Sequence, residues 1–147
     1  MARSKIAPPP ASPDETEQQF YEALQRGDID RLMAVWSDDE EISCVHPGGQ
    51  RVMGARAIRA AFESIFANGA IHARPEQVRR LQTHTCSVHN VLEHIQLMTA
   101  EGPQSAWVVA TNVYVKTAQG WRLVSHHASP GSPGEAQEVV EAASVLH

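Results

Sequence analysis

The apolar positions in the first part of the chain recur at helical spacing. In the segment DETEQQFYEALQRGD, which starts at Asp14, the side chains of Phe20, Ala23 and Leu24 fall on one side of a helix. Asp14 is the expected N-cap, with acidic residues in the first turn, and Gly27 is the expected stop. This pattern predicts an amphipathic helix with one side packed against the domain.

Two further helices and one short strand are expected before residue 70. A second, short helix is predicted to start at Asp28, and a third, the clearest in the chain, follows Gly54 and ends at Asn68-Gly69. Between them, residues 42–46 have strand character and run into the turn signal Pro47-Gly48-Gly49. Each helix has an apolar stripe: Ile29, Leu32, Met33 and Trp36 on the second, and Ile58, Ala61, Phe62, Ile65 and Phe66 on the third.

Strand patterns dominate the second half of the chain. Strands are expected near residues 71–86, 88–99, 106–117 and 121–129, with turns at Glu101-Gly102-Pro103 and Ala118-Gln119-Gly120. Helices followed by a run of long hairpins are typical of an α+β fold. About three N-terminal helices should then lie across one face of a curved antiparallel sheet.

The two ends of the chain are expected to lie outside this domain, which should span residues 14–130. Residues 1–13 hold four of the nine prolines, and Pro8-Pro9-Pro10 forms neither a helix nor a central strand, so a disordered tail is expected. Residues 131–147 are expected to be a second tail. A weakly amphipathic stretch within it either forms a short helix against a neighbouring subunit or frays: Val139, Val140, Ala143 and Val145.

Composition and charge narrow the class of protein. The chain has 147 residues and a formal net charge of −5, which favours one domain and argues against a nucleic-acid or anionic-membrane surface. No run of about eighteen apolar residues is present, and the first residues lack the apolar stretch of a secretory signal. Cys44 and Cys86 are therefore expected to be reduced thiols in a soluble, cytoplasmic protein.

The order of the expected helices and strands, together with particular residues, resembles the family of small cone-shaped domains like nuclear transport factor 2. Within that family it resembles the SnoaL-like branch. The likeness covers roughly residues 14–130. It rests on Leu24-Gln25-Arg26-Gly27-Asp28, Val45-His46-Pro47-Gly48-Gly49, Gly54, and the final hairpin Asn112-Val113-Tyr114, Gly120-Trp121-Arg122-Leu123 and His127-Ala128-Ser129. The resemblance implies a cone with the helices on the concave face of the sheet and a pocket inside.

The resemblance does not by itself imply a reaction. Similar domains serve as isomerases, polyketide cyclases, dehydratases, hydrolases and non-catalytic association modules. The closing strand is also similar to the association domain of calcium/calmodulin-dependent kinase II, which is not an enzyme. What the family implies is therefore a pocket for a small molecule.

The turns allow the strands to be aligned and their two faces to be compared. A hairpin centred on Ala118-Gln119 places Asn112 opposite Ser125, although a slip of one residue would exchange the faces. With this register, His127 is predicted to face the pocket and His126 the outside. The inner face is mostly apolar and carries a short polar row: Glu93, Asn112, Ser125 and His127.

Glu93 is predicted to lie among apolar side chains on this inner face. A carboxylate there is costly unless it is hydrogen-bonded or protonated, which is the usual start of a general acid/base site. Glu93, His127 and His46 are therefore the candidate catalytic residues, with Glu93 or His127 as base and His46 or the other group as acid. Alternatively, the polar row is a satisfied network that fixes strand register, and His46 stabilises its turn.

Six further residues are candidates for substrate binding. Asn112 and Tyr114 would orient an oxygen of the substrate, and Ser125 lies in the same row. Trp36, Tyr21 and Phe62 would form the wall of the pocket, and the alternative for these aromatic residues is ordinary core.

Neither a metal nor a cofactor is expected. The chain lacks GxSxG, phosphate-loop and GxGxxG motifs. His84, His89 and His94 are spaced five residues apart, so neighbours in this series point to opposite faces of a strand. A metal held across strands by His46, Glu93 and His127 is the alternative.

Three functions fit these observations. The first is a cofactor-free enzyme of the isomerase, cyclase or hydrolase kind, similar to ketosteroid isomerase, acting on a small, largely apolar metabolite. The second is a ligand-binding module without turnover. The third is an association domain that forms a homodimer through an outer sheet face with His94, Thr111, Val113 and Arg122. A homodimer is expected in any case, since Leu92 and Val113 would otherwise leave an exposed apolar patch.

Overall fold

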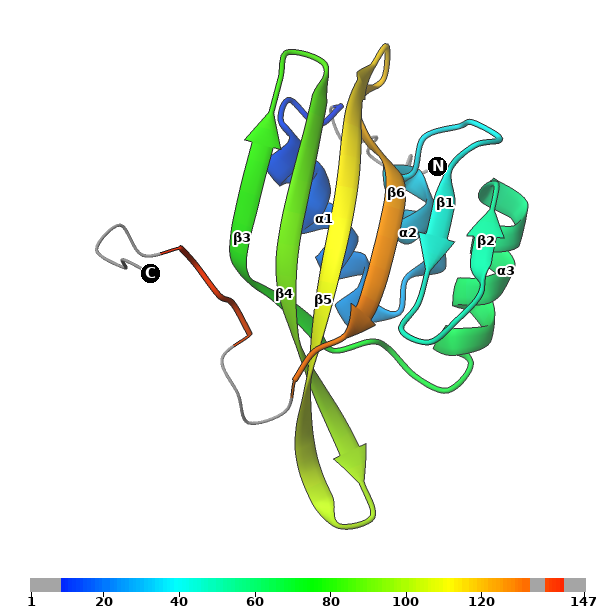
Figure 1. The fold of residues 1–147 in the computed structure, drawn as a ribbon. Coiled ribbons are helices and arrows are strands. Elements are labelled where there is room, and N and C mark those ends of the chain that lie inside the picture. The colour runs from blue at the N-terminus through cyan, green and yellow to red at the C-terminus, as the bar shows by residue number, and fades with distance from the viewer. Residues whose placement is uncertain (1–8, 133–136, 142–147) are drawn as a thin grey trace.

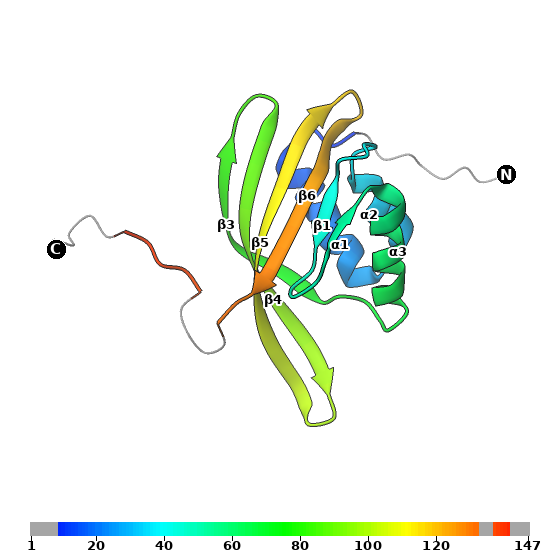
Figure 2. The same cartoon turned by 45° about the vertical axis from the view of Figure 1, so that its right-hand side comes forward.

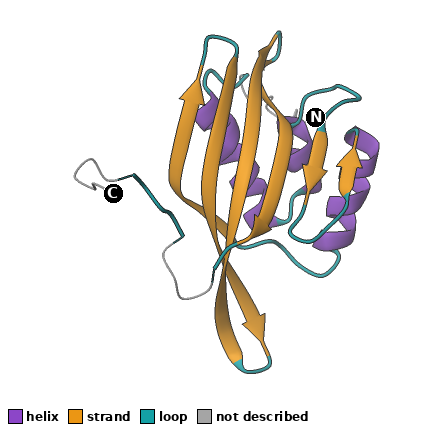
Figure 3. Cartoon of the chain, in the orientation of Figure 1, coloured by secondary structure: helices purple, strands orange, loops and turns teal. Residues whose placement is uncertain are grey.

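The computed structural model describes residues 9–132 and 137–141 of the chain. Three helices and two short strands come first, and four long strands follow (Figure 1, Figure 3). The helices are α1 (Pro13–Arg26), α2 (Ile29–Val35) and α3 (Ala55–Phe66). The strands are β1 (Ser43–Val45), β2 (Arg51–Met53), β3 (Ala73–Gln82), β4 (Cys86–Thr99), β5 (Gly102–Thr117) and β6 (Gly120–Pro130). The predicted α+β class is confirmed.

Local signals in the sequence set the ends of α1. The side chain of Ser12 accepts a hydrogen bond from the backbone N–H of Glu15, and Pro13 occupies the first turn. Ser12 is therefore the N-cap, and the expectation that Asp14 caps this helix is wrong. The helix ends as predicted at Gly27, which adopts the left-handed conformation with φ of 63°.

The strands form one six-stranded sheet in the order β2-β1-β6-β5-β4-β3. Neighbouring strands are antiparallel, except that β1 runs parallel to β6. The sheet is curved, and the three helices lie on its concave face, as expected for a cone (Figure 1, Figure 2). The end of the β4–β5 hairpin projects beyond the other strands.

A bulge in β6 decides which way its side chains point. β5 and β6 pair Asn112 with His126 but Tyr114 with Leu123, so Val124 is an extra residue in β6. The register predicted for this hairpin is therefore wrong by one residue after the bulge. Because alternate residues of a strand face opposite sides, the slip exchanges the faces of all residues that follow Val124.

The core lies between the helices and the concave face of the sheet. Phe20, Leu32 and Ile58 come from the three helices, and Cys44 and Leu123 come from β1 and β6; all five are fully buried in one cluster. Burying an apolar side chain of this size stabilises a fold by roughly 2 kcal/mol. The interior is therefore a packed core in which the polar side chains described below are embedded.

The ordered domain begins before Asp14. The carbonyl oxygen of Pro10 accepts a hydrogen bond from the backbone N–H of Trp121 at 3.1 Å, and Pro13 is the first residue of α1. The segment 9–13 therefore packs on the domain and is not part of a disordered tail. Residues 1–8 of that expected tail lie outside the described residues.

The described part of the expected C-terminal tail contains no helix. Residues 137–141 are irregular, and Glu138 forms an ion pair with Arg79 of β3 at 2.7 Å. Residues 133–136 and 142–147, which include much of the amphipathic stretch, lie outside the described residues. Within the described ranges, the helices are too short or too polar to cross a membrane.

Candidate functional site

A line of buried polar side chains crosses the interior from β4 to β6. The Tyr21 hydroxyl on α1 donates a hydrogen bond to Oε2 of Glu93 at 2.7 Å, and Nδ2 of Asn112 donates to the Tyr21 oxygen at 3.0 Å. Oδ1 of Asn112 lies 2.5 Å from Nδ1 of His126. We call Glu93, Tyr21, Asn112 and His126 the inner network; each of them is at most 4% exposed.

The direction of these bonds fixes the tautomer of His126. The carbonyl oxygen of Asn112 can only accept, so Nδ1 of His126 carries the hydrogen. Burial, followed by the charges of His46 and His127, lowers the pKa of His126 to about 3, and the ring is neutral at pH 7. Nε2 therefore carries a lone pair, and His126 ends the network as a hydrogen-bond acceptor.

Glu93 is the member of the inner network that titrates near neutral pH. Burial raises the pKa of Glu93 from 4.5 to about 7; the hydrogen bond from Tyr21 acts in the opposite direction, and the charge of Glu17 adds to the rise. Both the acid and the carboxylate are therefore populated near pH 7, where one group can both donate and accept a proton. Burial also raises the pKa of Tyr21 well above 10, so its phenol stays protonated.

His46, Phe62 and Cys44 border the His126 end of the network. The His46 ring packs edge-on against Phe62 with 4.9 Å between centroids, and 6.4 Å separates the centroids of His46 and His126. Nε2 of His46 lies 3.8 Å from Sγ of Cys44. Burial lowers the pKa of His46 and raises the pKa of Cys44 to about 12, so the thiol is not a reactive nucleophile.

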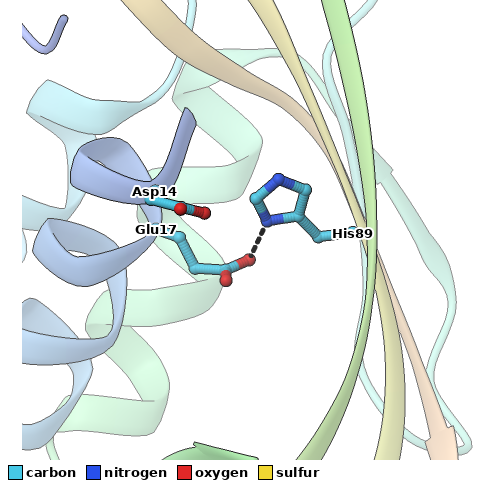
Figure 4. Close-up of side chains that lie close together, drawn as sticks. All are labelled: Asp14, Glu17 and His89. Carbon is cyan, nitrogen blue, oxygen red and sulfur yellow. Dashed lines mark hydrogen bonds and ion pairs between the residues drawn. The ribbon is translucent and has the colours of Figure 1, made fainter. Parts of the chain in front are cut away.

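A second buried network lies nearer the start of α1. Oε2 of Glu17 accepts a hydrogen bond from the Tyr114 hydroxyl at 2.8 Å and lies 2.9 Å from Nδ1 of His89. Nε2 of His89 lies 2.9 Å from Oγ of Ser87. We call these four residues the Glu17 network. Figure 4 shows Glu17 facing His89, with Asp14 on the same side of α1.

A surface groove between α1 and β3 reaches both networks. It has a volume of about 260 Å³ and is lined by Tyr21 of the inner network, by Glu17, and by Asp14, Gln18, Glu22, Gln25, Pro75, Val78 and Arg80. Sites for drug-sized ligands measure about 300–1,000 Å³, so this groove suits a smaller molecule.

The structure brings several of the predicted site residues together. Glu93, Asn112 and Tyr21 belong to the inner network, and Tyr114 belongs to the Glu17 network. His46 and Phe62 contact each other beside His126, as described above. Trp36 is buried and packs edge-on against Phe20 at 6.5 Å between centroids; within the described part of the chain, its indole Nε1 has no hydrogen-bond partner.

His127 and Ser125 are not part of this assembly, and the prediction that they face the pocket is wrong. His127 is exposed on the outer face, opposite Thr111. Ser125 pairs there with Ser43, with 3.0 Å between their hydroxyl oxygens. The cause is the extra residue Val124, which puts His126 in the place predicted for His127.

Four residues of the two networks were not among the predicted site residues: Glu17, Ser87, His89 and His126. The helical spacing could have identified Glu17, because it lies three residues before Phe20 and four before Tyr21 and therefore on the buried side of α1. Ser87 and His89 alternate along β4 with Val91 and Glu93 and therefore face the same way. No comparable local signal points to His126.

Comparison with known proteins agrees with this architecture. The family model for the SnoaL-like domain matches residues 14–133. The chain belongs to the SnoaL-like family. No curated protein matches it.

Solved structures similar to this SnoaL-like protein include proteins of two kinds. A candidate calcium/calmodulin-dependent protein kinase type II association domain from Thiobacillus denitrificans is 32% identical, with a TM-score of 0.77; the match covers 86% of this chain and 100% of that chain. A candidate dehydratase of the NTF2-like family from Streptomyces avermitilis is also 32% identical, with a TM-score of 0.72 and coverage of 80% and 91%. The S. rosetta CaMKII hub, at 23% identity and a TM-score of 0.66 over 83% and 99%, shares the fold.

Proposed function

We propose that this SnoaL-like protein is a cofactor-independent acid/base catalyst for a small, largely apolar molecule that carries a carbonyl group. The observation that carries the proposal is the 2.7 Å bond between the Tyr21 hydroxyl and Glu93, a buried carboxyl whose pKa is about 7. Enzymes tune carboxyl groups to this range so that they exchange protons at neutral pH. The dehydratase name of the 32% identical S. avermitilis protein supports chemistry of this kind.

The roles follow from the donors and acceptors present. The Glu93 carboxylate would take a proton from the carbon next to the carbonyl group. As Glu93 becomes protonated, the single hydrogen of the Tyr21 hydroxyl would turn from Glu93 to the carbonyl oxygen, on which negative charge develops. Protonated Glu93 would then return the proton to another carbon, giving an isomer of the substrate. Asn112 and His126 are positioning residues, because they hold the Tyr21 oxygen in place.

The groove between α1 and β3 supports an access route to this site. Tyr21 lines it, so a ligand seated there contacts the residue that holds Glu93. Val78, Pro75 and the Tyr21 ring supply apolar surface, as a largely apolar ligand requires.

The experiment that tests the proposal needs no knowledge of the natural substrate. The protein would be incubated in D₂O with small cyclic ketones and lactones, and NMR would follow deuterium exchange at the carbon next to the carbonyl group. We expect turnover with at least one of these compounds, reduced about 100-fold or more by Glu93→Gln. Glu41→Gln, an exposed carboxylate elsewhere, is the matched control and should keep full activity. No turnover by the wild type, or turnover indifferent to Glu93→Gln, contradicts the proposal.

A second candidate function is homodimeric association through the outer sheet face, and it is compatible with catalysis. The observation in its favour is a patch of partly exposed apolar side chains on this face of β5, formed by Trp107, Val109 and Val113. The association-domain name of the T. denitrificans protein, also 32% identical, supports it. The cytoplasmic location expected from the sequence stays a prediction.

A further inference from the structure

We infer that Asp14, Glu17 and His89 form a binding site for a divalent transition-metal ion, with Zn²⁺ as the best fit. Each residue offers one ligand atom, and the three atoms all lie within 4.8 Å of one another. Asp14 and Glu17 are neighbours on one side of α1, and His89 faces them from β4 (Figure 4). One imidazole nitrogen with two carboxylate oxygens is a zinc or manganese ligand set, whereas calcium and magnesium take oxygen ligands.

The two buried ligands are already oriented by partners of their own. His89 is fully buried and Glu17 is 5% exposed. Oγ of Ser87 lies 2.9 Å from Nε2 of His89, and the Tyr114 hydroxyl donates to Glu17 at 2.8 Å. In metal sites the second nitrogen of a ligating histidine and the ligating carboxylates are hydrogen-bonded in this manner. Ser87 and Tyr114 would therefore be the supporting residues of the site.

The ion can enter without a change in the number of protons on a neutral His89. In a neutral His89 without the ion, Nδ1 would carry the hydrogen and donate to the Glu17 carboxylate, while Nε2 would accept from the Ser87 hydroxyl. With the ion on Nδ1, the hydrogen resides on Nε2 and is donated to the oxygen of Ser87, whose own hydrogen turns away. A hydroxyl serves in either role, so the Ser87 contact is kept in both tautomers.

The groove leaves one side of the inferred metal site open, and Arg80 competes with the ion for the Asp14 carboxylate. Asp14 and Glu17 both line the groove, so the remaining coordination positions of an ion face water or a ligand seated there. Nε of Arg80 donates to Oδ1 of Asp14 at 2.7 Å. Since both side chains of this pair are largely exposed, the pair is weak and opens easily for an incoming ion.

The inferred ion would join α1 to β4 beside the groove. It would bind Glu17, whose charge adds to the raised pKa of Glu93, but it would not contact Glu93 itself, so the acid/base proposal does not require the ion. Its effect would be to stabilise the native state, because an ion that binds the folded form alone shifts the folding equilibrium towards it.

The test is calorimetric titration of the full chain with ZnCl₂ and MnCl₂, with thermal unfolding as a second readout. We expect one Zn²⁺ bound per chain, more tightly than Mn²⁺, and a rise in unfolding temperature on binding. Asp14→Asn removes the exposed ligand and leaves the His89–Glu17 contact intact; it should weaken Zn²⁺ binding about tenfold or more. Arg80→Met removes the competitor and should tighten binding by about two- to fivefold. Asp38→Asn, an exposed carboxylate elsewhere, should change nothing.

NMR of the His89 ring supplies a structural readout. The ring hydrogen should move from Nδ1 to Nε2 when Zn²⁺ is added, and not in Asp14→Asn at the same concentration. The inference is overturned by an absence of Zn²⁺ binding, by a binding constant that neither Asp14→Asn nor Arg80→Met changes, or by a His89 tautomer unaffected by the ion. Binding that survives both substitutions would come from surface histidines.

Discussion

Nδ1 of His126 donates a hydrogen bond to Oδ1 of Asn112 at 2.5 Å, and the two residues are register partners on β6 and β5. His127, the next residue, is exposed on the opposite face. Two adjacent histidines thus occupy a packed interior and a solvated surface, and the same substitution should affect them very differently.

His126→Ala should destabilise the protein by about 2–4 kcal/mol, because it leaves a cavity and an unsatisfied Asn112 oxygen. His127→Ala should lie within about 0.5 kcal/mol of the wild type, since it removes only an exposed side chain. Urea unfolding at pH 7.5 measures both. Equal effects of the two substitutions would contradict the bulge at Val124.

Glu93 should make the stability fall as the pH rises. Its pKa is about 7 in the native state and 4.5 in its unperturbed form, so the native state binds this proton more tightly than the unfolded state does. The contribution is complete below about pH 4.5 and is lost as the pH rises to about 7, and it amounts to about 3 kcal/mol. His126, with its pKa lowered to about 3, acts oppositely and reduces stability as the pH falls below about 6.5.

A comparison with Glu93→Gln isolates the carboxyl group from the histidines. Glutamine keeps an oxygen that accepts from Tyr21 but does not titrate. The free energy of unfolding of the variant, relative to the wild type, should therefore rise by about 3 kcal/mol between pH 4.5 and 7 and be constant above. Urea unfolding at half-unit steps of pH checks this. A difference that does not vary with pH would mean that Glu93 has an ordinary pKa.

Tyr21→Phe should raise the pKa of Glu93 further. The hydrogen bond from the Tyr21 hydroxyl favours the carboxylate form, so its loss favours the acid, by about one pH unit. Tyr114→Phe is the matched control, because it removes the same group from a tyrosine bonded to Glu17. Carbon-13 NMR of the Glu93 carboxyl group follows both titrations. If the pKa of Glu93 shifted more in Tyr114→Phe than in Tyr21→Phe, the hydrogen bond from Tyr21 would not be the one that favours the Glu93 carboxylate.

Val113→Glu should separate the proposed homodimer into monomers. It places a charge in the centre of the outer sheet face, where a paired surface would have to bury it. Ala60→Glu, at an exposed position of α3 on the other side of the sheet, introduces the same charge away from that face and should leave the dimer intact. Sedimentation velocity distinguishes the two states. A monomeric wild type would refute the outer-face dimer.

The elements could be predicted from the sequence because their signals are local. Gly27 ends α1 through its own left-handed conformation, and Gly54 precedes α3 with φ of 86°. Glu93 and Asn112 were predicted on the inner face of the sheet, and both are buried inside the cone. This prediction agrees with the structure because inward- and outward-facing side chains alternate regularly along the strands that carry them.

The orientation of the two histidines could not be predicted, since it depends on one extra residue. Val124 is a β-branched residue that suits a regular strand, and nothing in the neighbouring sequence marks a bulge. The Glu17–His89 contact was missed for a different reason: its residues are 72 positions apart and meet only when α1 packs on β4. Both features are products of tertiary packing.

The parallel pairing of β1 with β6 limits how early the protein can fold during its synthesis. Cys44 pairs with His126, and the Thr16 hydroxyl on α1 donates to the carbonyl oxygen of Trp121, 105 residues later in the chain. The first helix and the first strand therefore cannot make these contacts until β6 has been synthesised, and such distant pairings fold slowly. A nascent chain halted at residue 119 should be cleaved by protease along its whole length. Cooperative unfolding of that fragment would instead show that the core forms without the last strand.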